Sequence, residues 1–365
     1  MKVLLARHSI RLTGFFLVLT CAIFACASGK LSSKSVANIS PGAGTPNAES
    51  SPIQNARTEP LRLLQRIPLP KVEGRIDHMA MDVVGQRLFV AALGNNSLEV
   101  VDLKKGVRSQ SVPGFHEPQG VRYLPESNTI VVAGGGDGAV TFLDGSSLKP
   151  LKTTRFSSDA DNVRYDVTHR RVYVGYGAGA LGVLDDKGAR LADVPLDGHP
   201  ESFQLDTAAG KIFVNIPTRR EIAVIDMNTS SVSTTWPVSV ASANYPMALD
   251  EVQHRILVMT RKPPHLLVYD TETEKLIANL ETDSDCDDVF YDSARRRLYA
   301  SFGEGTVVVY EQVDADHYKM NARISTAAGA RTSFFSPELH RLYVAVPHRA
   351  NPTAEILVYE VAPEG

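Results

Sequence analysis

A short motif recurs seven times along this chain, and its spacing constrains the fold more than any other feature. Each copy has a turn-forming residue, usually Asp, then a four-residue turn and a strand of the Arg-Leu-Tyr-Val-Ala type. The seven copies begin at Asp82, Leu124, Asp166, Asp206, Asp250, Asp292 and Ser336. The intervals between them are 42, 42, 40, 44, 42 and 44 residues. A repeat of this length indicates an array of similar supersecondary units.

A second strand, which ends in an acid, follows in every copy. Its seven occurrences are Val-Val-Asp102, Phe-Leu-Asp144, Val-Leu-Asp185, Val-Ile-Asp226, Val-Tyr-Asp270, Val-Tyr-Glu311 and Val-Tyr-Glu360. Gly-rich turns such as Gly134 to Gly138 separate the strands, as in β-hairpins. Four short strands in each period are typical of a propeller blade. We therefore predict an all-β fold, a seven-bladed β-propeller of four-stranded blades.

The seventh blade lacks its outer strand, because the chain ends at Gly365 shortly after Val-Tyr-Glu360. The segment Leu61 to Leu69, which precedes the first repeat, has the length and apolar content to replace that strand. We predict that it pairs in blade seven and closes the ring. Closure of this kind removes two exposed strand edges.

The first 27 residues predict an export signal. Lys2, Arg7 and Arg11 precede an uncharged apolar run from Leu12 to Ala27, which is the order of a secretory signal peptide. This run of 16 residues is shorter than the roughly 20 that a transmembrane helix needs. We therefore expect an exported bacterial protein, located in the periplasm, at the outer membrane or outside the cell.

Two ways of processing this signal remain open. Ala25-Cys26-Ala27 offers small residues for simple cleavage, whereas Ile23 to Cys26 resembles a lipobox, in which Cys26 becomes acylated and anchors the protein to a membrane. Residues 28–58 are rich in Ser, Ala, Asn, Gly and Pro and predict a flexible linker. Residues 59–365 then form the propeller.

The motifs resemble a known group of propellers. The period, the Arg-Leu-Tyr-Val-Ala strand and the Val-x-Asp strand, over about residues 74 to 360, are similar to the YVTN-repeat seven-bladed propellers and the bacterial YncE-like exported proteins. The resemblance implies a propeller of the wider WD40-like/YVTN superfamily. True WD40 repeats are not matched, because the chain has only one Trp, Trp236. These families share a scaffold across different roles, so the resemblance implies no particular activity.

Two features recur in most blades and therefore indicate a structural role for their residues. The Asp of each turn and the basic residue five positions later recur in nearly every blade, so we expect the Asp to accept backbone N–H groups of its turn. Aromatic residues recur in the second strands, and we expect them in the core between blades. They are Phe89, Tyr173, Phe213, Tyr299 and Tyr343.

The candidate site is the mouth of the central channel. The inner strand of each blade lines such a channel, and the segments that lead into the inner strands share one face. Together the seven segments carry eight acids, three histidines and two arginines, which predicts a polar and mainly acidic mouth. The candidate binding residues are Asp77, His78, His116, Asp161, His199, Asp287, Asp288 and Arg331. A basic flank that includes Arg219, Arg220 and Arg261 is expected on the same face.

Two interpretations of this mouth remain open. Asp77, His78, Asp161, His199 and Asp287 could converge on a cation such as Ca²⁺ or Mg²⁺. Alternatively, the polar side chains line a water-filled tunnel, and nearby histidines and Arg331 offset the acids. No His-x-x-x-His or Cys-x-x-Cys spacing supports a metal site, so no cofactor is predicted.

The sequence contains no catalytic signature. It has no Gly-x-Ser-x-Gly motif, and the acids beside Cys286 should raise its thiol pKa and disfavour a nucleophilic thiolate. The leading hypothesis is a non-enzymatic binding or scaffold protein of the cell envelope, whose upper face, which carries the channel mouth, takes an envelope protein, a peptide or a glycan. The alternative is a metal-dependent, lactonase-like hydrolase with its ion at the mouth.

Two further classes of partner are constrained by charge and by the signal. The net charge of −3 argues against nucleic-acid binding, which needs a basic surface. Contact with a membrane is expected only through a lipid anchor on Cys26. The sequence carries no signal for a particular oligomeric state.

Overall fold

The computed structural model describes residues 59–349 and 352–363. The predicted signal peptide, Cys26 and the linker lie outside the described residues. Within the described ranges, no helix is both long and apolar enough to cross a membrane.

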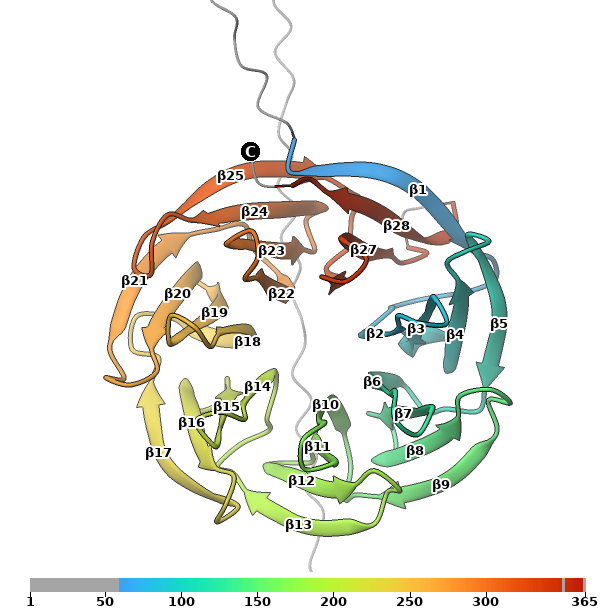
Figure 1. Cartoon of the computed structure of the whole chain (residues 1–365), viewed down its shortest axis with the longest axis horizontal. Coiled ribbons are helices and arrows are strands. Elements are labelled where there is room, and N and C mark those ends of the chain that lie inside the picture. The colour runs from blue at the N-terminus through green and yellow to red at the C-terminus, as the bar shows by residue number, and fades with distance from the viewer. Residues whose placement is uncertain (1–58, 350–351, 364–365) are drawn as a thin grey trace, which may run out of the picture. The chain divides into compact units, whose positions relative to one another are not determined.

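Seven four-stranded antiparallel sheets are arranged around a central channel (Figure 1). Blades one to three consist of β2 (Met79–Asp82), β3 (Arg87–Ala92), β4 (Ser97–Asp102), β5 (Val107–Pro113), β6 (Pro118–Leu124), β7 (Thr129–Gly134), β8 (Ala139–Asp144), β9 (Pro150–Arg155), β10 (Ala160–Asp166), β11 (Arg171–Tyr176), β12 (Ala180–Asp185) and β13 (Arg190–Pro195). A single 3₁₀ turn, Leu93–Asn95, is the only helical element of the described residues.

The remaining blades repeat this plan. Blades four to six consist of β14 (Phe203–Asp206), β15 (Lys211–Ile216), β16 (Glu221–Asp226), β17 (Ser231–Pro237), β18 (Ser242–Asp250), β19 (Arg255–Lys262), β20 (Pro264–Asp270), β21 (Leu276–Glu281), β22 (Cys286–Asp292), β23 (Arg297–Phe302), β24 (Thr306–Gln312) and β25 (Tyr318–Ser325). Blade seven consists of β26 (Thr332–Ser336), β27 (Arg341–Val346), β28 (Ala354–Val361) and β1 (Leu61–Leu69). The predicted all-β, seven-bladed propeller is confirmed.

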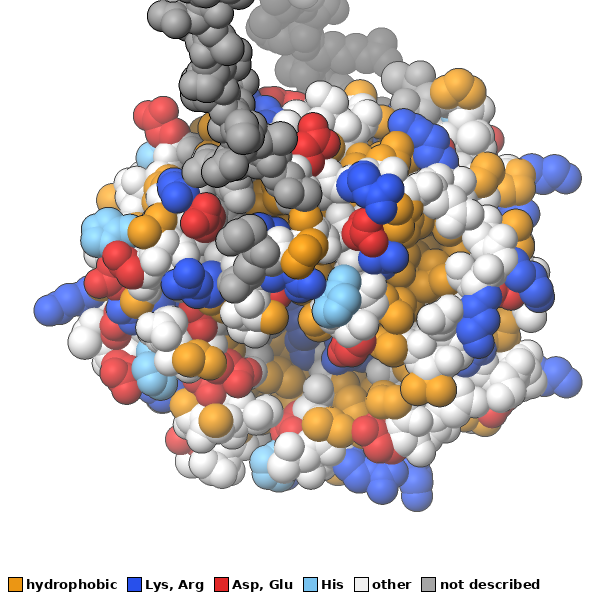
Figure 2. All heavy atoms as spheres, turned by 45° about the horizontal axis from the view of Figure 1, so that its top comes forward, with side chains coloured by type: hydrophobic (Ala, Val, Ile, Leu, Met, Phe, Trp, Pro, Cys, Tyr) orange, Lys and Arg blue, Asp and Glu red, His pale blue; other side chains and the backbone are white. Residues whose placement is uncertain are grey.

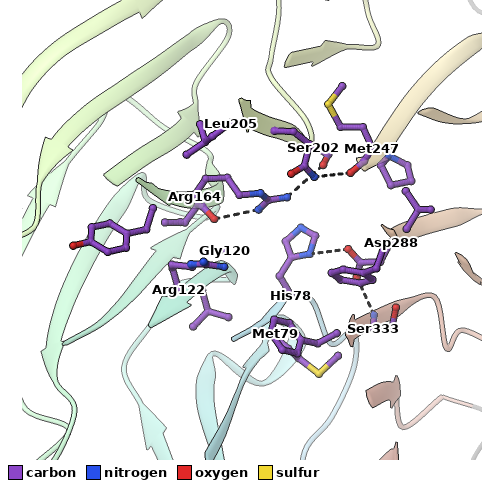
Figure 3. Close-up of a pocket in the computed structure, with 18 residues that line it drawn as sticks. His78, Met79, Gly120, Arg122, Arg164, Ser202, Leu205, Met247, Asp288 and Ser333 are labelled. Atoms are coloured by element: carbon purple, nitrogen blue, oxygen red, sulfur yellow. Dashed lines mark hydrogen bonds and ion pairs between the residues drawn. The ribbon is translucent and has the colours of Figure 1, made fainter. Parts of the chain in front are cut away.

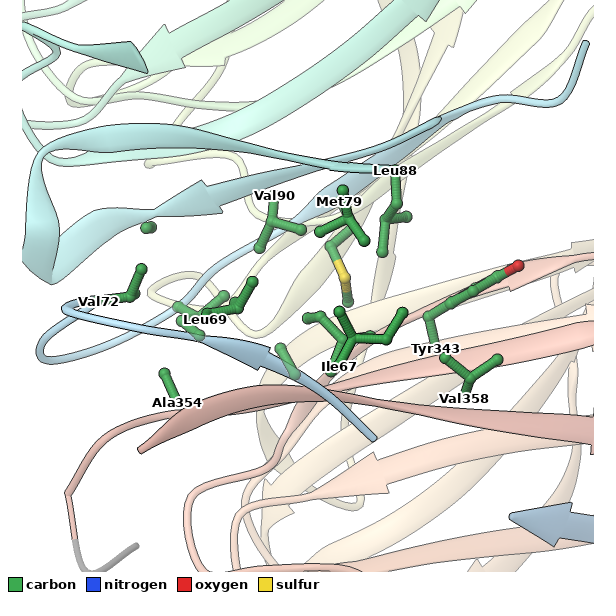
Figure 4. Close-up of a cluster of buried hydrophobic side chains, with 14 of the residues drawn as sticks. Ile67, Leu69, Val72, Met79, Leu88, Val90, Tyr343, Ala354 and Val358 are labelled. Atoms are coloured by element: carbon green, nitrogen blue, oxygen red, sulfur yellow. The ribbon is translucent and has the colours of Figure 1, made fainter. Parts of the chain in front are cut away.

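The N-terminal strand closes the ring, as predicted. β1 pairs antiparallel with β28, from Leu61 opposite Val361 to Leu69 opposite Ala354. Ile67 and Leu69 are fully buried in a cluster that also contains Leu88 of blade one (Figure 4). β1 therefore completes blade seven and also packs against blade one.

The core is divided among the blades. Seven clusters of buried side chains each join two neighbouring blades. The second strand of each blade is covered on both faces, which explains why it is continuously apolar in the sequence. All five aromatic residues predicted between the blades are buried: Phe89, Tyr173, Phe213, Tyr299 and Tyr343.

The recurring acids stabilise their turns, as predicted. Asp82 Oδ1 accepts a hydrogen bond from the backbone N–H of Gly85 at 2.8 Å, and its Oδ2 accepts one from Arg87 Nε at 2.9 Å. Asp206 and Asp250 accept backbone N–H groups at the same place in their blades. These turns fix where each inner strand ends, and thereby which residues reach the channel.

Candidate functional site

His78 lies at the centre of the channel mouth, within ion-pair distance of three carboxylates from three blades. Its Nδ1 is 3.5 Å from Asp288 Oδ1, as Figure 3 shows. Its Nε2 is 3.7 Å from Asp77 Oδ1 and 3.9 Å from Asp161 Oδ1. Burial alone would lower the pKa of His78, but the carboxylates, led by Asp288, outweigh burial and raise that pKa to about 10. This raised pKa favours the imidazolium form of His78 at neutral pH.

Three arginines pair with the acids of the mouth. Arg75 Nη2 is 2.6 Å from Asp77 Oδ2. Asp287 is held from two sides, by Arg261 Nη2 at 2.5 Å and by Arg331 Nε at 2.9 Å. Arg261 was expected in a basic flank outside the mouth, but it belongs to this network, because β19 extends to Lys262 and carries it over the acids of β22. The protein thus supplies its own counter-ions.

Three carboxyl groups at the mouth have raised pKa values. Burial raises the pKa of Asp161 to about 7, and burial together with the charge of Asp287 raises that of Glu201 to about 7. Burial also raises the pKa of Asp77, against the opposing effect of His78. The Glu201 carboxyl group makes no hydrogen bond or ion pair within the described part of the chain, although the charges of Arg261 and His78 act on it.

Two of the candidate histidines lie outside this network. His116 is exposed before β6 and lines a separate hollow with Phe115. His199 donates from Nδ1 to the carbonyl of Gly177 at 2.6 Å and lies 3.7 Å from Asp159. Sequence position placed both histidines in the right segments, but the His199 side chain turns to local partners and the His116 side chain is exposed.

The five candidate metal ligands do not form a ligand set. Among residues 59–349 and 352–363, no group of three or more His, Cys, Asp or Glu side chains is arranged to hold a metal ion. Arg75 pairs with Asp77, and Arg261 and Arg331 pair with Asp287, so these two carboxylates already have cationic partners within the protein.

Cys286 has the properties expected of an inert thiol. It is buried, and its Sγ donates to the backbone carbonyl of Asp288 at 3.5 Å. Burial raises its pKa far above the ordinary value, and the charges of Asp287 and Asp288 add to this effect. The thiolate form needed for nucleophilic attack is therefore strongly disfavoured.

Gly120 allows two blades to approach each other at the mouth. A Cβ atom at this position would lie 2.0 Å from the backbone oxygen of Asp161. We expect Gly120→Ala to push β6 from β10 and to lower the free energy of unfolding by about 1–3 kcal/mol. Urea denaturation measures this change, and an unaltered midpoint would contradict the close approach.

Sequence reasoning missed several residues that face the channel. Arg75 and Glu201 stood in the right segments but were not selected. Arg122 and Arg164 lie deeper in the channel and were not considered (Figure 3). A signal for them existed, because the tripeptide Val-Arg-Tyr occurs in the inner strands of blades two and three, whereas the other blades have Ala, Gln or Phe at the arginine position.

Comparison with known proteins supports the fold alone. No protein-family model and no curated protein matches the sequence. Hydrazine synthase of Kuenenia stuttgartiensis superimposes with a TM-score of 0.66 at 15% identity, covering 79% of this chain and 96% of that one. A chain of the mitotic checkpoint complex superimposes with a TM-score of 0.72 at 11% identity, covering 89% and 99%. Because 1786 chains of solved structures match, the likeness identifies a β-propeller and singles out no function.

Proposed function

We propose that this protein is an exported binding protein of the bacterial cell envelope, without enzymatic activity, and that its partner docks on the face that carries the channel mouth. The observation that carries the proposal is the network around His78, which holds side chains from several blades in fixed positions. A preorganised polar surface loses little conformational entropy when a partner binds. A kinship with the YVTN-repeat, YncE-like propellers rests on the strand motifs alone.

The charge of the mouth favours a partner with a basic group. Six acids lie there with four cationic side chains: Asp77, Asp161, Glu201, Asp285, Asp287 and Asp288 with Arg75, His78, Arg261 and Arg331. Because the pKa values of Asp161 and Glu201 are raised to about 7, both groups are partly protonated at neutral pH and the excess of negative charge is small. Glu201 makes no ion pair among the described residues, and Asp159 is half-exposed at the rim. We infer that a protein or peptide of the envelope inserts a lysine or arginine side chain here.

Figure 2 shows acidic and basic side chains interspersed over the face that it presents, without a broad basic area. At the channel mouth itself, an aromatic ring accompanies the charged groups. The guanidinium of Arg261 stacks on the Tyr245 ring, with 4.2 Å between its carbon and the ring centroid. An aromatic side chain beside fixed charges is typical of residues that carry binding energy at protein interfaces.

The route to the envelope is part of the proposal. It relies on the signal-like residues 1–27, with either cleavage or acylation at Cys26, and on the linker of residues 28–58. The pairing of mouth acids with arginines favours this proposal over the alternative, a metal-dependent hydrolase.

Neutralising two mouth acids should weaken partner binding. We expect the tagged full chain to retain a protein from envelope extract, and Asp159→Asn combined with Glu201→Gln to retain at least about tenfold less of it, because a basic group loses its counter-charges. Glu272→Gln, on an exposed turn at the opposite ends of the strands, is the matched control and should bind like the wild type.

Three outcomes would contradict the proposal. The first is equal retention by the mouth variant and the wild type. The second is retention of glycan in place of protein. The third is hydrolysis of a lactone or ester library by the purified chain, which would favour the enzymatic alternative.

A further inference from the structure

A cavity of about 300 Å³ occupies the channel below the mouth, and residues from all seven blades line it (Figure 3). His78 and Asp288 lie at its upper end. In five blades, the residue two positions before the end of the inner strand also lines the cavity. These residues are Arg122, Arg164, Gln204, Phe290 and Phe334.

Two arginines from adjacent blades share this level. Arg122 projects from β6 and Arg164 from β10, and both are directed into the cavity in Figure 3. In the described part of the chain, the Arg122 side chain makes no hydrogen bond or ion pair, and its Nε is fully buried. Arg164 donates from Nη1 to the backbone oxygen of Val163 at 3.1 Å and from Nη2 to Ser202 Oγ at 3.4 Å. Neither guanidinium has a carboxylate partner among the described residues.

The acids near Arg122 and Arg164 face other groups. Asp288 accepts the backbone N–H of Ser333 at 2.9 Å and faces His78. Asp161 faces His78 as well. Glu338, the acid whose charge acts on Arg122, is exposed on a turn of blade seven. The two arginines therefore have unused donors in a place where a bound anion could accept them.

Burial makes this arrangement costly for the protein alone. Burial lowers the pKa of both arginines, and the charge of Arg122 helps to lower that of Arg164 to about 10, against the opposing effects of Asp288 and Asp161. Two like charges held close together in a largely buried place destabilise a fold unless direct counter-charges offset them. Among the blades, only two and three carry arginine at this level, whereas blades one and five carry alanine, so the fold itself does not require it.

The opposite wall of the cavity is aromatic. Phe290 and Phe334 meet edge to face, with ring centroids 6.1 Å apart, and Met79 and Met247 extend this apolar lining. A second hollow of about 790 Å³ shares Arg122, Phe290 and Phe334 with the cavity. Its lining includes turn residues such as Pro125 and Pro337 at the lower ends of the inner strands. A ligand could therefore enter from the face opposite the mouth.

We propose that this cavity binds a small organic anion, whose carboxylate is held by Arg122 and Arg164 and whose apolar body packs against Phe290 and Phe334. The planar guanidinium groups suit a two-oxygen head group. The cavity volume lies within the range of small-molecule sites. This site lies below the mouth and does not depend on the partner proposed for the mouth.

The test uses the full chain and three probes: 3-phenylpropionate, its uncharged amide and inorganic phosphate. Isothermal titration calorimetry measures binding. We expect 3-phenylpropionate to bind at least about tenfold more tightly than either other probe, because only it supplies both the charge and the apolar body. Arg122→Gln and Arg164→Gln should each weaken its binding at least about tenfold, whereas Arg219→Gln, at an exposed surface position, should leave it unchanged.

A second readout separates a ligand site from a structural role. If the arginines are there to bind an anionic ligand, Arg122→Gln should raise the melting temperature of the unliganded protein, because it removes one of two like charges. The same substitution should remove the increase in melting temperature that 3-phenylpropionate causes in the wild type. Equal binding by the two arginine variants and the wild type would overturn the proposal. So would binding of phosphate or the amide as tight as that of 3-phenylpropionate, or no binding at about 10 mM, a concentration that detects millimolar affinity.

Discussion

Replacing His78 with glutamine should lower the free energy of unfolding by about 3–5 kcal/mol at neutral pH, because the change leaves buried carboxylates without their central cation. Asp77, Asp161 and Asp288 all lie within 3.9 Å of the imidazole nitrogens. Chemical denaturation of the two proteins measures the difference. The exposed pair of His317 and Asp314 offers a matched control, and His317→Gln should change stability little.

The effect of His78→Gln should depend on pH in a defined direction. The folded-state pKa of His78 is raised from 6.5 to about 10, so its stabilisation is complete below pH 6.5 and is lost as the pH rises through 10. The raised pKa of Asp161, about 7, means that the folded state also holds this proton longer than the unfolded state. Both groups make wild-type stability fall as the pH rises.

A second substitution keeps this prediction testable if His78→Gln folds poorly. Asp161→Asn in the His78→Gln protein should restore part of the lost stability at pH 7, because it removes one of the unopposed charges. A His78→Gln protein as stable as the wild type between pH 7 and pH 9 would show that the imidazolium does not neutralise the mouth.

Deleting residues 60–70 should abolish cooperative folding or lower the melting temperature sharply, because blade seven would lose its outer strand. The ladder between β1 and β28 runs from Leu61 to Leu69, and Ile67 and Leu69 are fully buried. Within β1, Ile67→Ala should cost about 2–5 kcal/mol. Leu64→Ala is the matched control, because Leu64 is 40% exposed in the same strand and should cost little.

Removal of residues 28–57 provides a second comparison, since we expect this segment to contribute almost nothing to folding. Calorimetry compares all these proteins. Equal melting temperatures for the intact chain and the protein without residues 60–70 would contradict closure of the ring by β1.

The repeat allowed most of the fold to be predicted, for a physical reason. Each blade is a local unit whose turns and strand ends are set by residues near in sequence, as the contacts of Asp82 with Gly85 and Arg87 illustrate. Even the long-range closure followed from counting strands. Blade seven lacked one strand and the segment Leu61 to Leu69 had no blade, so pairing of this segment with the open edge of blade seven was the simplest arrangement.

The contacts at the channel could not be predicted in the same way. Whether His78 meets Asp288, or His199 meets Asp159, depends on how side chains from different blades turn within the ring. The segments were identified correctly, but Arg261, which was expected in a loop, joined them from the end of β19, the second strand of blade five. Residues in the right segment were thus predictable, whereas their partners were not.

The arginines of the lower channel were missed for a different reason. The candidate residues were taken from the start of each inner strand and the segment before it, whereas Arg122 and Arg164 lie further along β6 and β10 at equivalent positions, each between Val and Tyr. A charged residue between two apolar residues in a largely buried strand is in conflict with burial, and this conflict is visible in the sequence.

The most direct test of the account is the protonation state of His78. If His78 offsets the charge of the mouth acids, its imidazole is protonated, whereas an imidazole that binds a metal ion must be neutral. We propose nitrogen-15 NMR of the imidazole over a pH titration, with and without Ca²⁺, Mg²⁺ or Zn²⁺. We predict an imidazolium that persists to a pKa of about 10 and does not respond to any of these ions. A neutral imidazole at pH 7 whose resonances shift with added metal would contradict the account and favour a metal centre at the channel mouth.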